Sequence, residues 1–161
     1  MTDHTPIKRH KAIVSFSKDH HFGLLLVWKI RQGLKKAISI ERISNYVLSF
    51  FTENLQNHFN EEEEMLFCKL PDGDDLRKQA EADHKAIYKL IVAISENKND
   101  AYLLNQFADK LEKHIRFEER ELFNHLQKNI GSEELAEIEK RLSNDGKTID
   151  EIWPDPFWNI K

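Results

Sequence analysis

The sequence predicts an all-α protein that folds as an up-down-up-down four-helix bundle with a short C-terminal helix and an aromatic tail. Four long segments repeat apolar residues at helical spacing, and no segment shows the alternation of a β-strand. Short breaker sequences separate these segments, and short loops between long helices favour antiparallel neighbours. A length of 161 residues with 40% hydrophobic content fits one domain with a single sizeable core.

The four long helices are expected between these breakers. The first runs from about Ile7 to Ala37, and the second from about Ile40 to Cys68. The third begins at Asp74, whose acidic side chain suits the positive end of a helix dipole, and ends near Ser95. The fourth runs from about Ala101 to Lys128 and is closed by Gly131.

We treat residues 1–161 as one domain, with the core bundle at about 10–128 and a C-terminal helix and tail at 132–161. The fifth helix covers about Ser132 to Leu142. Trp153, Phe157 and Trp158 follow in the tail, and we expect them to cover apolar surface at one end of the bundle. A homodimer contact is the alternative use of these aromatic side chains.

Composition excludes several classes of function. The formal net charge of -4 gives no sign of a nucleic-acid partner. The longest apolar run, Leu24 to Trp28, is too short to span a membrane, and the polar N-terminus lacks the apolar core of a signal peptide. The only cysteine, Cys68, excludes an intrachain disulfide, and we expect it to be buried or half-buried. We expect a cytoplasmic protein with no membrane partner.

Two HxxxE motifs carry the chemistry. His58 with Glu62, and His114 with Glu118, are spaced so that both side chains lie on one helical face. One such pair would mean little, because a chain of this composition contains about one by chance. The apolar stripes of the helices strengthen the signal, because six candidate residues lie on them and so face the core: His20, His58, Glu62, His84, His114 and Glu118.

The six residues also lie at one height in the predicted bundle. His20 and His58 are each 19 residues from a turn at residue 39, and His84 and His114 are each 15 residues from a turn at residue 99. Residues equally distant from a turn lie side by side in antiparallel helices, so every helix delivers a ligand to the same level. Six buried polar side chains need a common reason, and a metal centre supplies one.

Four imidazoles and two carboxylates are too many for one tetrahedral zinc ion. The natural assignment is two metal ions with Glu62 and Glu118 bridging them. Mixed imidazole and carboxylate ligands suit iron best, with manganese or zinc possible. Two neighbours compete for these places: His21, which we expect on the outer face, and Glu61, which is either an alternative bridge or a solvated or nearby supporting residue. We expect Glu119 to be an ordinary solvated residue.

The segments SKDHHFGLLLVWKIRQGLKK, NHFNEEEEMLF, EADHKAIYKLI and EKHIRFEERELF resemble the hemerythrin-like proteins with the HHE cation-binding domain. The resemblance spans about Phe16 to Leu126 and implies a four-helix bundle around a non-haem di-iron centre with ligands in the order H, HxxxE, H, HxxxE. Oxygen-carrying members have a second histidine one turn along the third helix. Here Tyr88 follows His84 by four residues, so reversible oxygen carriage is not expected. Tyr88 is either a hydrogen-bond partner near the site or a packing residue.

The resemblance implies that the protein handles O₂, NO, peroxide or iron by binding, sensing or buffering. The alternative is a small di-iron redox enzyme, such as an oxidase, a peroxidase or a repair factor. A purely structural di-metal site is a further alternative. The expected partner is a small diatomic or peroxide ligand.

Overall fold

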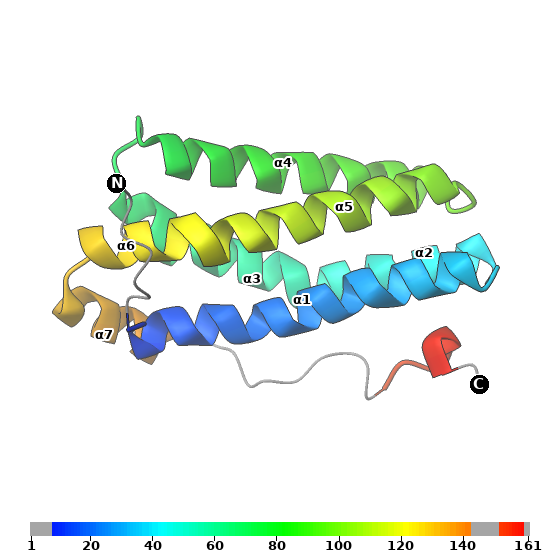
Figure 1. Ribbon diagram of the computed structural model, residues 1–161, viewed down its shortest axis with the longest axis horizontal. Helices are drawn as coiled ribbons and strands as arrows, with labels where there is room; N and C mark the ends of the chain where they lie inside the picture. Colours follow the sequence, from blue (N-terminus) through cyan, green and yellow to red (C-terminus); the bar gives the residue numbers. More distant parts are fainter. Residues whose placement is uncertain (1–7, 143–151, 160–161) are drawn as a thin grey trace.

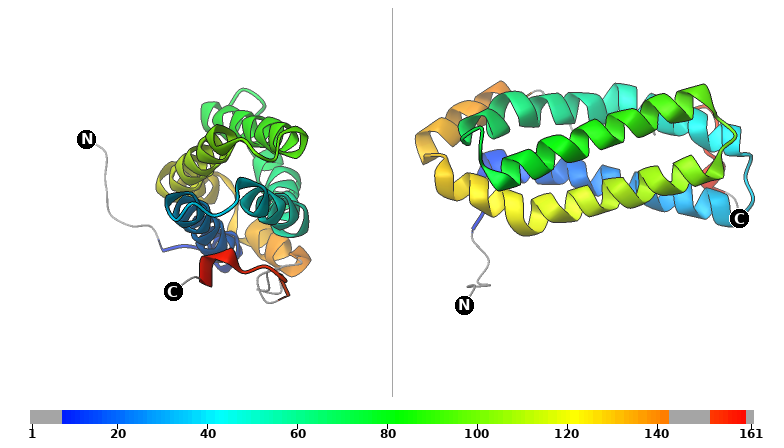
Figure 2. Two further views of the ribbon diagram at one scale, coloured as in Figure 1. Left: turned by 90° about the vertical axis from the view of Figure 1, so that its right-hand side faces the viewer. Right: turned by 90° about the horizontal axis from the view of Figure 1, so that it is seen from above.

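The computed structural model describes residues 8–142 and 152–159, and every regular element in these ranges is helical. Long helices lie side by side as a bundle, and α7 covers the end at which the chain enters α1 (Figure 1). The end-on view in Figure 2 shows these helices as columns around a common centre. The all-helical prediction is therefore confirmed. Within the described residues, none of the helices is long and apolar enough to cross a membrane.

The first and third columns are the single helices α1 (Lys11–Lys35) and α4 (Asp75–Glu96). The second column is α2 (Ile40–Phe50), the π-helical turn η1 (Phe51–Leu55), α3 (Gln56–Glu61), a second π turn η2 (Glu62–Leu66) and the 3₁₀ turn η3 (Phe67–Lys69). The fourth is α5 (Ala101–Phe117), the π turn η4 (Glu118–Leu122) and α6 (Phe123–Asn129). The helix α7 (Ser132–Arg141) and the 3₁₀ turn η6 (Phe157–Asn159) complete the described chain.

Side-chain caps fix where the helices begin. His10 accepts a hydrogen bond from the Ala12 amide, so α1 starts at Lys11; the predicted start at Ile7 lies outside the described residues. The Asp74 carboxylate accepts from the amide of Arg77, and Asp100 caps α5 in the same way. A cap of this kind satisfies an amide at the helix start that has no partner within the helix.

The second and fourth columns differ from the uninterrupted helices that the sequence predicted. Each π turn takes one more residue per hydrogen-bonded ring than an α-helical turn, so the side chains beyond it shift around the axis. Of the three π turns in the described part of the chain, two begin at Glu62 and Glu118, the carboxylates of the HxxxE motifs. The interruptions therefore coincide with the place where the bundle interior becomes polar.

The interior contains two apolar clusters. One gathers residues towards the α1–α2 connection, including Leu26, Phe50 and Phe107, and the other gathers residues towards α7, including Phe16 and Leu126. Along α1 and α4 the candidate ligands His20 and His84 fall between the residues of these two clusters, and on the other two columns the ligands lie at the boundary between the clusters. The polar level is thus enclosed by apolar layers on both sides.

The C-terminal tail packs against the bundle as expected. Phe157 is buried within the larger apolar cluster, and Trp153 and Trp158 pack against it. All three aromatic rings contact Tyr46 of α2, and the Nζ of Lys29 lies 3.8 Å from the centre of the Trp158 ring. The tail therefore covers apolar surface near the α1–α2 end of the bundle (Figure 1).

Candidate metal centre

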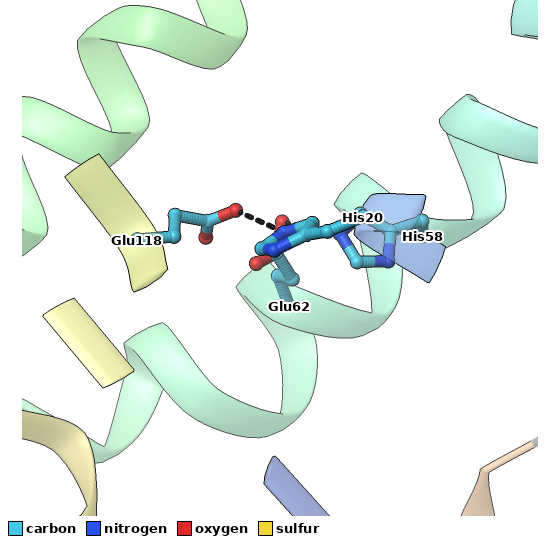
Figure 3. Close-up of side chains that lie close together, drawn as sticks. All are labelled: His20, His58, Glu62 and Glu118. Atoms are coloured by element: carbon cyan, nitrogen blue, oxygen red, sulfur yellow. Dashed lines mark hydrogen bonds and ion pairs between the residues drawn. The ribbon is translucent and has the colours of Figure 1, made fainter. Parts of the chain in front are cut away.

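The six residues singled out from the sequence come together in the middle of the bundle. His20 comes from α1, His58 from α3, and His84 and His114 from α4 and α5; Glu62 and Glu118 begin the π turns η2 and η4. All six are at most 5% exposed, and both glutamates are fully buried. Figure 3 shows the side chains of His20, His58, Glu62 and Glu118 close together, with His20 paired to Glu118.

The six side chains form two groups, and each group could hold a metal ion. One group is His20, His58, Glu62 and Glu118, and the other is Glu62, His84, His114 and Glu118. Within each group the candidate ligand atoms all lie within 4.8 Å of one another. Both carboxylates belong to both groups, which is the arrangement that two neighbouring ions with bridging carboxylates require.

Most of the inward atoms have no hydrogen-bond partner. Among the candidate ligands, the buried atoms in this state are Nε2 of His58, both oxygens of Glu62, both ring nitrogens of His84, Nε2 of His114 and Oε2 of Glu118. Buried polar atoms are nearly always paired, and leaving one unpaired costs about 1–3 kcal/mol. A concentration of such atoms at one point is the donor set that a cation would satisfy.

Three of the histidines donate their outward nitrogen to a carboxylate. The Nδ1 atoms of His58 and His114 lie 2.8 and 2.9 Å from Asp19 and Asp83, respectively. The Nδ1 of His20 lies 3.0 Å from Glu119. We call Asp19, Asp83 and Glu119 the outer carboxylates. A carboxylate can only accept, so the hydrogen is on Nδ1, and in the neutral ring the lone pair is on the inward Nε2.

The fourth histidine is held differently. The Nδ1 of His84 is 3.5 Å from Oε1 of Glu63 and makes no hydrogen bond. Its ring stacks on Phe59 instead, with centroids 4.0 Å apart. His20 has both kinds of support, because its ring also stacks on Phe123 with centroids 5.1 Å apart. The orientation of each imidazole is thus set by an outer carboxylate, an aromatic face, or both.

Two outer carboxylates are themselves bound by cations. Asp83 accepts from Lys110 at 2.8 Å and from Gln79 at 3.0 Å. Glu119 accepts from Arg9 at 2.9 Å and from Ser17 at 2.8 Å. Burial opposes ionisation of Glu119, yet hydrogen bonds from His20, Arg9 and Ser17 lower its pKa to about 2. Both side chains therefore carry negative charge at neutral pH.

The electrostatics of the inner groups follow from their mutual proximity. Burial disfavours the charged form of His114, but Glu118 and Asp83 raise its pKa to about 10. Burial would raise the pKa of Glu118, but His114 and its hydrogen bonds hold that pKa well below the usual value. Burial opposes the charged form of the other three histidines as well, but neighbouring carboxylates raise their pKa values: Glu118 and Glu119 act on His20, Glu62 and Asp19 on His58, and Glu62 and Glu63 on His84. The carboxylates thus create a site that attracts positive charge.

A cavity of about 10 Å³ adjoins the first group. Its polar lining includes His20, His58, His114 and Glu118. Its other wall is apolar and consists of Gly23, Leu55, Phe59, Leu111 and Ile115. The space is about that needed for one water molecule.

Several neighbouring residues were also assigned from the sequence. His21 is exposed, so the prediction of an outward position is confirmed. Glu61 is buried and accepts from Asn57, and it belongs to neither group of candidate ligands. The prediction that Glu119 is a solvated residue was wrong, because it binds His20. The prediction that Cys68 is buried was also wrong, because it is exposed.

Tyr88 is placed as a packing residue. Its ring contacts those of Phe51 and Phe59 at 5.1 and 6.2 Å between centroids. Phe59 in turn stacks on His84, so Tyr88 reaches the site through an aromatic neighbour. This geometry supports the second of the two readings that the sequence left open.

The outer carboxylates were missed from the sequence. Glu119 directly follows a candidate ligand, and Asp19 and Asp83 directly precede one, but each binds a histidine on another helix. In the sequence, only their position next to a candidate ligand could have identified these carboxylates. A residue next to an inward-facing one lies at the side of the helix, close to the neighbouring helix. Acidic residues are common on helix flanks, so the signal is weak without the helix packing.

Comparison with family models gave one match: the Hemerythrin HHE cation binding domain, over residues 13–126. Comparisons with curated proteins and with solved structures gave no significant match. The matched range contains all six candidate ligands and the three outer carboxylates. The chain therefore belongs to the hemerythrin HHE cation-binding domain family.

Proposed function

We propose that this protein binds two iron ions in an up-down-up-down bundle and uses them to handle O₂, NO, peroxide or iron itself. The ligands are His20, His58, Glu62, His84, His114 and Glu118, with both glutamates bridging. One observation carries the proposal: two groups of buried imidazoles share the same pair of carboxylates. The unpaired atoms of these groups supply a donor set of mixed nitrogen and oxygen, which suits iron.

Bound iron would supply redox chemistry and affinity for small ligands. The chain contributes orientation, because Asp19, Asp83 and Glu119 fix their histidines with Nε2 directed inward. It also contributes negative charge, because the outer carboxylates add to the charge of Glu62 and Glu118. Manganese or zinc would satisfy the same donors, so the choice of metal is the part that experiment must test first.

The size of the adjoining cavity supports a small ligand. A space of about 10 Å³ excludes an organic substrate unless the surrounding side chains move. Its apolar wall of Gly23, Leu55, Phe59, Leu111 and Ile115 offers no hydrogen-bonding side chain to a polar ligand. Diatomic molecules such as O₂ and NO suit such a wall better than a charged substrate does.

Elemental analysis and absorption spectroscopy of the purified protein test the metal assignment. We expect two iron ions per chain and the near-ultraviolet absorption of a ferric pair. Glu118→Gln should lose iron, whereas the exposed neighbour Glu121→Gln should retain both ions. One zinc ion and no iron per chain would contradict the proposal.

Mixing the reduced, iron-loaded protein with O₂, NO or hydrogen peroxide separates the possible uses of the site. Stoichiometric binding of O₂ or NO supports a binding or sensing protein. Repeated turnover with an added reductant indicates a redox enzyme instead. Two zinc ions and no reaction with any of the three ligands would indicate a structural site.

A further inference from the structure

Arg9 links the segment before α1 to the surroundings of His20. Its Nη1 donates to Oε1 of Glu119 at 2.9 Å and to Oγ of Ser17 at 2.8 Å. Its Nη2 donates to the backbone carbonyl of Glu119 at 2.6 Å. Ser17 donates to the second oxygen of Glu119 at 2.8 Å, so the carboxylate is held on both oxygens and at its own backbone.

The same guanidinium reaches the second support of His20. It lies 5.6 Å from the centre of the Phe123 ring, which stacks on the His20 imidazole with an interplanar angle of 4°. Glu119 receives the Nδ1 hydrogen of that imidazole. Arg9 therefore contacts both the residue that binds the edge of His20 and the residue that covers its face.

The residues on either side of Arg9 are also fixed. The side chain of Gln127 donates to the carbonyl of Lys8 at 2.7 Å and accepts from the amide of His10 at 2.8 Å. His10 then caps α1 through its own side chain. The backbone around Arg9 is thus bound to α6 through Gln127 and continues directly into α1.

We propose that Arg9 is a positioning residue of the metal centre: it holds Glu119 and Phe123, and through them it fixes the imidazole of His20. This inference rests on the proposed binding of metal at His20. A planar guanidinium suits the role, because its donors can bind a carboxylate, a hydroxyl and a carbonyl at once. The described segment before α1, Lys8 to His10, then belongs to the site without supplying a candidate ligand.

The chain offers a matched control for the loss of an arginine. Arg42 donates to both oxygens of Asp155 at 2.9 and 2.6 Å, so it too makes a two-point contact with a carboxylate. This pair lies at the tail, and neither residue contacts a candidate ligand. Arg42→Ala therefore removes an interaction of the same kind without touching the supports of His20.

The test loads Arg9→Ala, Arg9→Lys, Glu119→Gln and Arg42→Ala with ferrous iron in the absence of oxygen. Ions per chain, iron release to a chelator, and the melting temperature of the metal-free protein are then measured. We expect Arg9→Ala to lose one of its two ions about tenfold faster than the unaltered protein, at the lower end of the range for outer partners of metal ligands. The other ion should be unaffected, and Arg9→Lys should restore part of the difference.

A spectroscopic readout separates positioning from simple structural support. Cobalt(II) in place of iron reports ligand geometry through its visible absorption, and Arg9→Ala should change these bands while Arg42→Ala leaves them unchanged. If Arg9→Ala does not fold, Ser17→Ala and Glu119→Gln should give the same selective loss of one ion. Release of both ions at equal rates, together with a lower metal-free melting temperature than that of Arg42→Ala, would overturn the inference.

The outcomes also separate this inference from the proposed function. An unaltered protein that binds no metal at His20 would contradict the metal centre itself. An unaltered protein with two ions, and an Arg9→Ala variant that releases them at the rates of Arg42→Ala, would overturn only the role of Arg9.

Discussion

The two nitrogen atoms of each candidate histidine face different surroundings. Nε2 of His58, His84 and His114 lies 3.2 to 3.3 Å from an oxygen of Glu62 or Glu118 without a hydrogen bond. On the outer side, His58 and His114 each bind a carboxylate. An ion between the inner atoms would replace contacts that are close but poorly directed. In these histidines the inner Nε2 atom could therefore bind a metal. In His58 and His114 the outer Nδ1 atom holds the ring in place.

The choice between the adjacent residues His20 and His21 gives a direct test at this scale. His20 is 4% exposed and belongs to the first group of candidate ligands, whereas His21 is exposed. We expect His20→Ala to lose at least one ion per chain and His21→Ala to retain both, as measured by elemental analysis. The reverse result would show that α1 is rotated by one residue relative to this structure.

The sequence was sufficient to select the six inward residues but not their outer partners. Selection worked because helical periodicity and distance from a turn are both local quantities, and they agree at His20, His58, His84 and His114. The outer carboxylates bind histidines 31 to 99 residues away in the chain. Which carboxylate meets which histidine depends on the sides of two helices that face each other. These sides are set by the helix packing angle, which cannot be derived from the spacing of apolar residues.

For the helices, the ends predicted from the sequence agree with the structure, whereas the prediction that each helix is uninterrupted does not hold. Breaker residues place the connections near residues 36–39, 70–74 and 97–100, where the structure has them. The π turns at Phe51–Leu55, Glu62–Leu66 and Glu118–Leu122 were not predicted, because no breaker residue marks them. Their positions next to the polar level suggest that the packing of the centre selects them.

The start of α4 provides a prediction on pH dependence. Burial would raise the pKa of Asp74, but hydrogen bonds from the Arg77 amide and from His125 hold that pKa below its usual value. A lowered folded-state pKa means that the carboxylate stabilises the protein above about pH 4, the pKa of an unfolded aspartate. This contribution is lost as the pH falls further, through the folded-state pKa of Asp74.

We therefore expect Asp74→Asn to lower the free energy of unfolding by about 1 kcal/mol at neutral pH, the scale of one part-exposed hydrogen bond. The difference from the unaltered protein should vanish at the acid end of the range. Denaturant unfolding at a series of pH values measures it. The control is Asp75→Asn, which removes an exposed aspartate beside Asp74 at the start of the same helix. A difference that persists in acid would contradict the assignment.

The aromatic tail gives a second prediction at the scale of elements. Trp158 lies over Lys29 and 4.7 Å from the Tyr46 ring, far along α1 from the candidate ligand His20. Trp158→Ala should lower the free energy of unfolding by about 2 kcal/mol, less than for a fully buried aromatic side chain, and leave two ions bound. Ile152→Ala, at a position 81% exposed, is the control and should change neither quantity. Loss of metal in Trp158→Ala would show that the tail is coupled to the centre.

At the scale of the whole molecule, a polar layer divides the apolar interior into two clusters. The layer contains two fully buried carboxylates and four imidazoles, and their removal from water is costly unless each charge is compensated. In the metal-free protein the raised pKa values of the histidines allow protons to supply part of this compensation. Several buried atoms of the two groups nevertheless make no hydrogen bond in the structure.

The stability of the bundle should therefore depend on the metal. An ion that binds only the folded state stabilises it by about 4 kcal/mol when its free concentration is a thousand times the dissociation constant. For a domain of this size, such a change corresponds to a rise in melting temperature of roughly 10 °C per ion. Calorimetry of the iron-loaded protein, the same protein after chelation and the protein reloaded with iron measures the difference, which reloading should restore. His21→Ala should show the same metal-dependent shift, because its side chain faces outward. Equal melting temperatures with and without iron would contradict the proposal that the polar layer is built around bound metal.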